Sequence, residues 1–104
     1  MIYLAGKITD KNKAQEEANK LHFHAKTQEL RELGLEVYNP AEDEDGGETW
    51  EKYLAKDLHI IFSGKIDKGF MMKGWEDSLG ARLEHEAFLR LQKTNTQFKI
   101  IYEQ

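Results

Sequence analysis

The sequence predicts an α/β protein in which helices cover both faces of a parallel sheet of four or five strands. Short apolar runs alternate with longer segments of helical periodicity along the whole chain. Strands that alternate with helices in this way are joined by right-handed crossovers and lie parallel. The 104 residues contain one proline and no linker-like stretch, so we expect residues 1–104 to form a single domain.

The first strand and helix are predicted within residues 1–33. Residues 1–5, MIYLA, are a short apolar run typical of a buried strand. A helix is expected from about Lys11 to Leu33, and Gly34 supplies its stop. Its inward stripe is predicted from apolar residues at steps of four and three, namely Ala14, Ala18, Leu21 and Ala25, and is continued by Leu30 and Leu33.

The middle of the chain repeats this order. Residues 35–40, LEVYNP, predict a second strand that ends before Pro40. Residues 41–48 form an acidic loop that we expect to be solvated. Thr49 can then cap a helix that runs to about Phe62. The inner side of this helix is predicted to carry Trp50, Tyr53, Leu54, Leu58 and Ile61.

The last part of the chain adds two strands and a helix. Residues 68–74, KGFMMKG, predict the third strand. The third helix is expected to be capped by Asp77 or Ser78 and to end near Lys93. Residues 98–103, FKIIYE, predict the fourth strand. Ligands of such sheets bind beyond the carboxyl ends of the strands, so the loops at those ends are the candidate site. These loops are residues 6–10, 39–47 and 73–80.

Composition excludes several classes of protein. Fifteen basic and nineteen acidic residues give a net charge of -4, which argues against nucleic acid as the main partner. The absence of cysteine excludes disulfides and a thiol nucleophile. No run reaches the roughly 20 apolar residues of a membrane span, and the start, MIYLAGKITD, is not a secretory leader. We therefore expect a cytoplasmic protein that binds neither nucleic acid nor membrane.

Two carboxylates interrupt apolar stripes. Asp57 lies between Leu54 and Leu58, and Glu84 is in line with Phe88 on the third helix. A buried ionised carboxylate is costly unless it is paired, hydrogen-bonded or kept protonated by a raised pKa. Either residue could instead lie at a helix edge and reach solvent. Because both helices flank the same edge of the predicted sheet, a functional pair is an equal alternative.

The start of the third helix is also unusual. Gly80 in the first turn costs up to about 1 kcal/mol relative to alanine, a cost that room for a ligand against the backbone would offset. Free N–H groups at a helix start suit a phosphate. The alternative is a glycine packed against a neighbouring strand. Trp75, on a turn between glycines, is the aromatic residue we expect at a ligand.

Several familiar motifs are incomplete. The segment AGKIT lacks the upstream glycine of a P-loop and has Ile8 where serine or threonine belongs. The segment GWEDSLG is not the GxSxG motif of serine hydrolases. His22 and His24 point to different sides of a helix, and His59 and His85 have no partner at ligand spacing. We therefore expect neither a metal nor another cofactor.

Four segments, MIYLAGKI, YNPA, AKDL and GWEDSLGARLEHEAF, resemble the small, often phage-encoded members of the nucleoside 2-deoxyribosyltransferase-like superfamily. That superfamily includes the 2'-deoxynucleoside 5'-monophosphate N-glycosidases. The resemblance covers nearly the whole chain and is sharpest at S-L-G-x-x-x-E, residues 78–84. It implies a flavodoxin-like (Rossmann-like) three-layer sandwich, normally with five parallel strands, and commonly a homodimer. Only four strands are clear here, so a fifth is short, lies in residues 63–67 or is absent.

The resemblance implies roles for the matched residues. Glu84 matches the nucleophile that attacks C1' of a 2-deoxyribosyl group. Asp57 matches an aspartate that helps to bind the substrate and assists departure of the base, and Tyr3 matches a tyrosine that orients the nucleophile. The substrate-binding residues are expected to be Gly6, Lys7, Ile8, Trp75, Ser78, Leu79 and Gly80.

The leading hypothesis is therefore an N-glycosidase or 2-deoxyribosyltransferase acting on a deoxynucleoside or its 5'-monophosphate. Cleavage of the N-glycosidic bond develops positive charge at C1', which one carboxylate can capture, while a second carboxyl protonates the leaving base. Lys7 and Thr9 replace the serine and arginine that deoxynucleotide hydrolases carry in the first loop. A nucleotide-binding module with weak catalysis is thus the alternative, and an interaction protein with structural carboxylates is a third.

Overall fold

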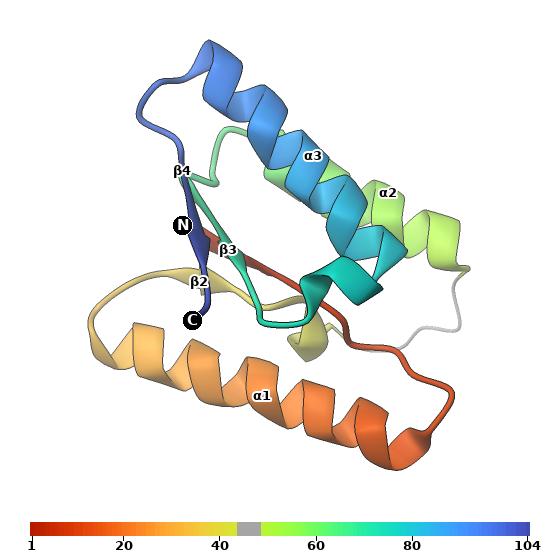
Figure 1. Ribbon diagram of the computed structural model, residues 1–104. Helices are drawn as coiled ribbons and strands as arrows, with labels where there is room; N and C mark the ends of the chain where they lie inside the picture. Colours follow the sequence, from red (N-terminus) through yellow and green to blue (C-terminus); the bar gives the residue numbers. More distant parts are fainter. Residues whose placement is uncertain (44–48) are drawn as a thin grey trace.

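The computed structural model of the protein describes residues 1–43 and 49–104 and has the predicted α/β architecture (Figure 1). Within these residues the elements follow in the order β1 (Ile2–Ala5), α1 (Lys13–Glu32), β2 (Val37–Tyr38), α2 (Trp50–Ile61), β3 (Lys68–Met71), α3 (Leu79–Thr94) and β4 (Lys99–Tyr102). Two short 3-10 helices, η1 (Pro40–Glu42) and η2 (Trp75–Asp77), follow β2 and β3.

The sheet is parallel, with the strand order β2-β1-β3-β4. Helix α1 covers one face, and α2 and α3 cover the other, so the fold is a three-layer sandwich of the flavodoxin-like (Rossmann-like) type (Figure 1). Tyr3 of β1 stands beside Tyr38 of β2 on one side and beside Gly69 of β3 on the other. The predicted fold class is confirmed.

Alternate residues of the strands pack against the two helix layers. The core beneath α1 contains Ile2, Leu4, Phe23, Val37, Phe70 and Met72. The core beneath α2 and α3 contains Tyr3, Ala5, Ile61, Ile66, Met71, Ala87, Phe88 and Phe98. Tyr3 therefore points toward the layer that carries both candidate carboxylates.

Close packing in this second core depends on a glycine. A Cβ atom added to Gly69 would lie 2.4 Å from the ring of Phe88, which is completely buried. Any side chain at position 69 would therefore push α3 away from the sheet. Since α3 also carries Glu84, this contact fixes how closely the candidate nucleophile approaches β1.

The inward stripe predicted for α1 is wrong. The members of that stripe that lie on the outer surface are Ala14, Ala18, Leu21, Ala25 and Leu33. Phe23 and Thr27 are buried instead, and Leu30 is half-buried. A phenylalanine buries far more apolar surface than an alanine, so Phe23 decides the rotation of the helix about its axis.

The helix ends agree with the predicted capping residues. The Thr49 hydroxyl accepts the backbone N–H of Lys52 at the start of α2, and the Ser78 hydroxyl accepts that of Ala81 at the start of α3. Gly34 follows α1 with a φ of 83°, a left-handed conformation that glycine adopts without strain. Both candidate carboxylates thus lie on helices whose starts are fixed by side-chain hydrogen bonds.

Some predictions differ from the structure or fall outside it. Residues 63–67 form no strand, so among the described residues the sheet ends at β4. The acidic loop predicted for residues 41–48 begins within η1, and its residues 44–48 lie outside the described part of the chain. No helix in the described ranges has the length and apolar character needed to cross a membrane.

Candidate active site

The centre of the candidate site is a buried contact between β1 and α3. The Tyr3 hydroxyl donates a hydrogen bond to Oε2 of Glu84. Tyr3 is completely buried, and Glu84 is only 6% exposed. The alternative in which Glu84 lies at a helix edge and reaches solvent therefore does not apply. Glu84 faces the core, as its position in the apolar stripe of α3 predicts.

Asp57 of α2 belongs to the same group of side chains but is half-buried, so it lies at the edge of the core and not within it. Burial, followed by the charges of Glu84 and Asp57, raises the pKa of the Tyr3 phenol well above its ordinary value. Hydrogen bonding with Tyr3 lowers the pKa of Asp57, but burial and the negative charge of Asp43 outweigh it and raise that pKa to about 6. Two carboxyl groups from different helices thus act on one phenol.

The two carboxyls bind protons with different strengths. Burial raises the pKa of Glu84 to about 8, and the charge of Asp57 contributes, although the hydrogen bond from Tyr3 opposes the rise. As the pH rises, Asp57 ionises first while Glu84 is still neutral, and its charge then resists ionisation of Glu84. Between about pH 6 and about pH 8 the pair therefore holds one proton and one negative charge.

A second aromatic residue supports Tyr3. The ring of Tyr38 stacks on that of Tyr3, with centroids 5.2 Å apart and an interplanar angle of 19°. The Tyr38 hydroxyl donates to Oδ2 of Asp43 at 2.7 Å, and Nζ of Lys56 lies 3.4 Å from the same oxygen. The sequence analysis singled out none of these three residues, although Asp43 lies in the candidate loop 39–47 and Tyr38 and Lys56 lie in the segments YNPA and AKDL. Tyr38 lies at the end of the second predicted strand, and this position could have indicated that it neighbours Tyr3 of the first strand.

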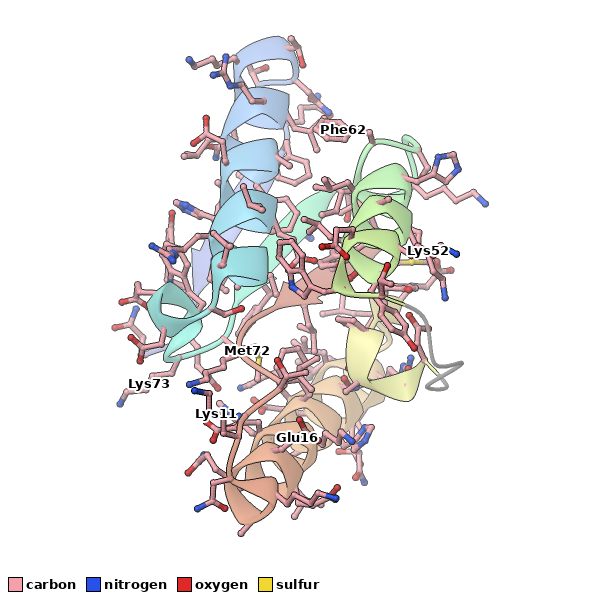
Figure 2. The ribbon with its side chains drawn as sticks, turned by 90° about the vertical axis from the view of Figure 1, so that its right-hand side faces the viewer. Lys11, Glu16, Lys52, Phe62, Met72 and Lys73 are labelled. Carbon is pink, nitrogen blue, oxygen red and sulfur yellow. The ribbon has the colours of Figure 1, made fainter. Side chains whose placement is uncertain are left out.

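A cleft opens beside this group, where the carboxyl ends of the strands meet the helix starts. Its volume is about 280 Å³, and its lining consists of Lys7, Thr9, Trp50, Asp77, Ser78, Leu79 and Gly80. Figure 2 shows the loop after β1, which carries Lys11, and the loop after β3, which carries Met72 and Lys73, on this side of the molecule. Phe62, at the other end of α2, lies far from them.

Helical spacing relates the cleft to the two carboxyls. Gly80 lines the cleft, and Glu84 is four residues further along the same face of α3. Trp50 lines the cleft from α2, and Asp57 lies two turns further along that helix. Neither carboxyl is among the residues that line the cleft, and each lies one or two helical turns beyond a residue of its wall.

The glycines of the predicted site differ in what surrounds them. A Cβ atom on Gly80 would meet only Trp50 and Ser78 atoms, at 3.8 and 3.9 Å. Gly80 is therefore not packed against a strand, the alternative considered from the sequence, and its open side faces the cleft. A Cβ atom on Gly6 would lie 2.7 Å from Cβ of Met72, so Gly6 is required by the packing of the first loop.

Two other predicted binding residues lie away from the cleft lining. Ile8 packs against the core beneath α1. The ring of Trp75 lies 4.4 Å from that of His85 and 6.4 Å from that of Tyr102. Trp50, which the sequence analysis placed on the inner side of α2, is 47% exposed at the cleft. The aromatic residue of the cleft wall is thus Trp50.

No group of histidine, aspartate and glutamate residues in the described ranges is arranged to hold a metal ion. The fold and the site define an α/β protein in which a buried glutamate and a half-buried aspartate lie on the two helices that cover one face of a parallel sheet. The chain belongs to the DUF4406 family, described as a domain of unknown function, whose family model matches residues 1–97. No curated protein and no solved structure matches the chain.

Proposed function

We propose that the protein is an N-glycosidase or 2-deoxyribosyltransferase acting on a deoxynucleoside or a deoxynucleoside 5'-monophosphate. The observation that supports this most is the group of Tyr3, Asp57 and Glu84, in which a buried and a half-buried carboxyl from different helices act on one phenol. Removing two neighbouring acidic groups wholly or partly from water is unfavourable for folding, so a use in chemistry is the reason we infer for it.

The chemistry needs one carboxylate and one carboxylic acid. In the proposed reaction, Glu84 forms a bond to C1' as the bond from C1' to the base nitrogen breaks, and Asp57 gives its proton to the leaving base. Water or the nitrogen of a second base then displaces Glu84 from C1' and gives a proton back to Asp57. The pair holds a single proton between about pH 6 and about pH 8, the number this reaction requires. The proton has to reside on Asp57 in the reactive form, and Tyr3 stabilises the charge on Glu84.

The cleft wall supports a polar group at the sugar 5' position. Lys7 and the first residues of α3 line it together, and the N-terminal end of a helix favours an anion. The Lys7 ammonium lies 3.3 Å from Oδ2 of Asp10, which holds it at the loop. Asp77 also lines the cleft and opposes an anion there. A comparison of the rates of base release from deoxynucleosides and from their 5'-monophosphates therefore decides between the two substrate classes.

The decisive experiment is incubation with a panel of deoxynucleosides and their 5'-monophosphates, with chromatographic detection of free base. Release of base from at least one member, dependent on Glu84, supports the proposal. Absence of release from every member, with binding still detected by calorimetry, favours the alternative of a nucleotide-binding module. Absence of both release and binding favours an interaction protein in which the carboxylates are structural.

Gly80→Ala is expected to leave the fold intact and to weaken binding of the substrate. The new methyl group meets no close protein atom, and alanine is the better helix former by up to about 1 kcal/mol. The same methyl group occupies the side of the backbone that the substrate would approach, so the Kd should rise by roughly tenfold. Calorimetry measures the Kd, and urea denaturation measures the free energy of unfolding.

Gly69→Ala is the matched contrast, because its methyl group would collide with Phe88. It should lower the free energy of unfolding by about 1–3 kcal/mol. Gly80→Ala and Gly69→Ala with equal losses of stability would show that Gly80 is structural. An unchanged Kd in a stable Gly80→Ala variant would remove the ligand from this side of the helix.

We also propose that the chain forms a homodimer, which the resemblance to the deoxyribosyltransferase-like superfamily implies. Leu79 and Leu83 are exposed on the same side of α3 and are available for such a contact. Light scattering should give a mass of twice 12.1 kDa at micromolar concentration. A mass of 12.1 kDa at the concentrations used for activity would contradict the proposal.

A further inference from the structure

A chain of polar and ring contacts runs from the surface of α2 to the candidate nucleophile. It begins at Lys56, whose ammonium pairs with Asp43, and continues through the hydrogen bond from Tyr38 to Asp43. The Tyr38 ring then stacks on Tyr3, which donates to Glu84. The residues that make these contacts come from five parts of the fold, namely α2, the end of η1, β2, β1 and α3.

The parallel register explains why this chain ends at the site. Tyr3 and Tyr38 are paired positions of neighbouring strands, so both rings point to the same side of the sheet. Tyr38 is half-buried, and its hydroxyl has Asp43 as its partner. A ring held at both its face and its hydroxyl limits the movement of the Tyr3 ring beside it. Phe88 contacts the Tyr3 ring edge-on, with centroids 5.9 Å apart.

We propose that Asp43 and Lys56 are positioning residues for this site. Asp43, held by Lys56, fixes the Tyr38 ring against Tyr3 and so keeps the Tyr3 hydroxyl on Glu84, while the balance of the two charges sets the protonation of Asp57. The kinetic part of this inference rests on the proposed function. The part that concerns protonation does not, because it can be measured without a substrate.

The charged and titratable groups that act on Asp57 come from four other parts of the fold and from its own helix. Tyr38 on β2 interacts with the charge of Asp57. Asp43 at the end of η1 raises the pKa of Asp57, Lys56 on α2 lowers it, and Tyr3 on β1 lowers it through hydrogen bonding. Glu84 on α3 is still neutral when Asp57 ionises. Changes at Asp43 and Lys56 should therefore move the proton affinity of Asp57 in opposite directions.

The first test is titration of the Asp57 carboxyl carbon by NMR in the full chain. Asp43→Asn removes a negative charge and keeps an acceptor for Tyr38, so the titration midpoint of Asp57 should move to lower pH. Lys56→Met removes a positive charge and leaves Asp43 unneutralised, so the midpoint should move to higher pH. Glu86→Gln is the control, because it removes one negative charge from an exposed ion pair with Arg90.

The second test is kinetic, with the substrate found in the panel. Tyr38→Phe keeps the stacked ring and removes the hydrogen bond to Asp43, so kcat should fall roughly tenfold with KM nearly unchanged. In Asp43→Asn, the low-pH limb of the pH–rate profile should move to lower pH together with the Asp57 midpoint. A purely structural role of Asp43 would change stability and leave this limb in place.

The outcomes separate this inference from the proposed function. Opposite shifts in Asp43→Asn and Lys56→Met, with no shift in Glu86→Gln, support the positioning pair even if no substrate is found. Midpoints that do not move, or that move in the same direction, overturn it even if base release is observed. Equal shifts in Glu86→Gln would show that net charge alone is responsible, which also overturns it.

Discussion

Glu84→Gln is expected to slow release of the base at least about a hundredfold, because loss of a nucleophile raises the barrier by several kcal/mol. Glutamine keeps the shape of the side chain and an oxygen that accepts the hydrogen bond from Tyr3. The variant should therefore fold normally and bind a deoxynucleotide with little change. Single-turnover measurements of base release, with the Kd from calorimetry, separate the loss of chemistry from a loss of binding.

Asp57→Asn is the informative companion of that variant. Its loss should be greatest for substrates whose bases leave poorly, since the proposed task of Asp57 is to protonate them. Glu86→Gln, also on α3 but exposed, controls for the loss of a negative charge. Base release that is unchanged in Glu84→Gln would remove the nucleophile role outright.

The second large effect of Glu84→Gln is expected on stability at alkaline pH. The reference pKa of an unburied glutamate is 4.5, whereas burial raises the pKa of Glu84 in the folded protein to about 8. Between these values the folded protein keeps a proton that the unfolded chain has lost, so stability falls as the pH rises. Above about pH 8 the loss is complete.

Glutamine does not ionise, so Glu84→Gln should be more stable than the wild type above about pH 8, by on the order of a few kcal/mol. Well below pH 4.5, where Glu84 is protonated in both states, the two should have similar free energies of unfolding. Urea denaturation across this range measures the difference. Parallel stability curves for the wild type and the variant would mean that Glu84 binds its proton equally tightly in the folded and unfolded states, so that burial does not raise its pKa.

The order of strands and helices was predictable from the sequence because each element has its own apolar pattern and is bounded by glycine, proline or capping residues. Glu84 was predictable for a related reason, since a carboxylate within the otherwise apolar stripe of Ala87, Phe88 and Leu91 has to face the sheet. The rotation of α1 was not predictable from its alanines. An alanine gains little from burial, so a single large residue, Phe23, decided which face packs.

The surroundings of the site were less accessible to the sequence. Asp43 and Lys56 carry no pattern that marks them, because each is an ordinary charged residue in a loop or on a helix surface. Their contacts with Tyr38 and with each other follow from the positions of η1 and α2 relative to β2. Trp50 and Trp75 illustrate the same limit. The ring of Trp75 packs against that of His85 and does not line the cleft, whereas Trp50 does.

The central position of β1 has a consequence for how the chain folds. The central pair of the sheet joins residue 2 to residue 68, and Tyr3 reaches Glu84 across 81 positions of sequence. Closing such long loops costs conformational entropy before the contacts between their ends can form and offset it. We therefore expect this topology to fold slowly compared with a helical bundle. Strand β1 is synthesised first, and its central partner β3 follows more than 60 residues later. The contact of Tyr3 with Glu84 therefore forms only after β1 has paired with β3 and α3 has packed on the sheet.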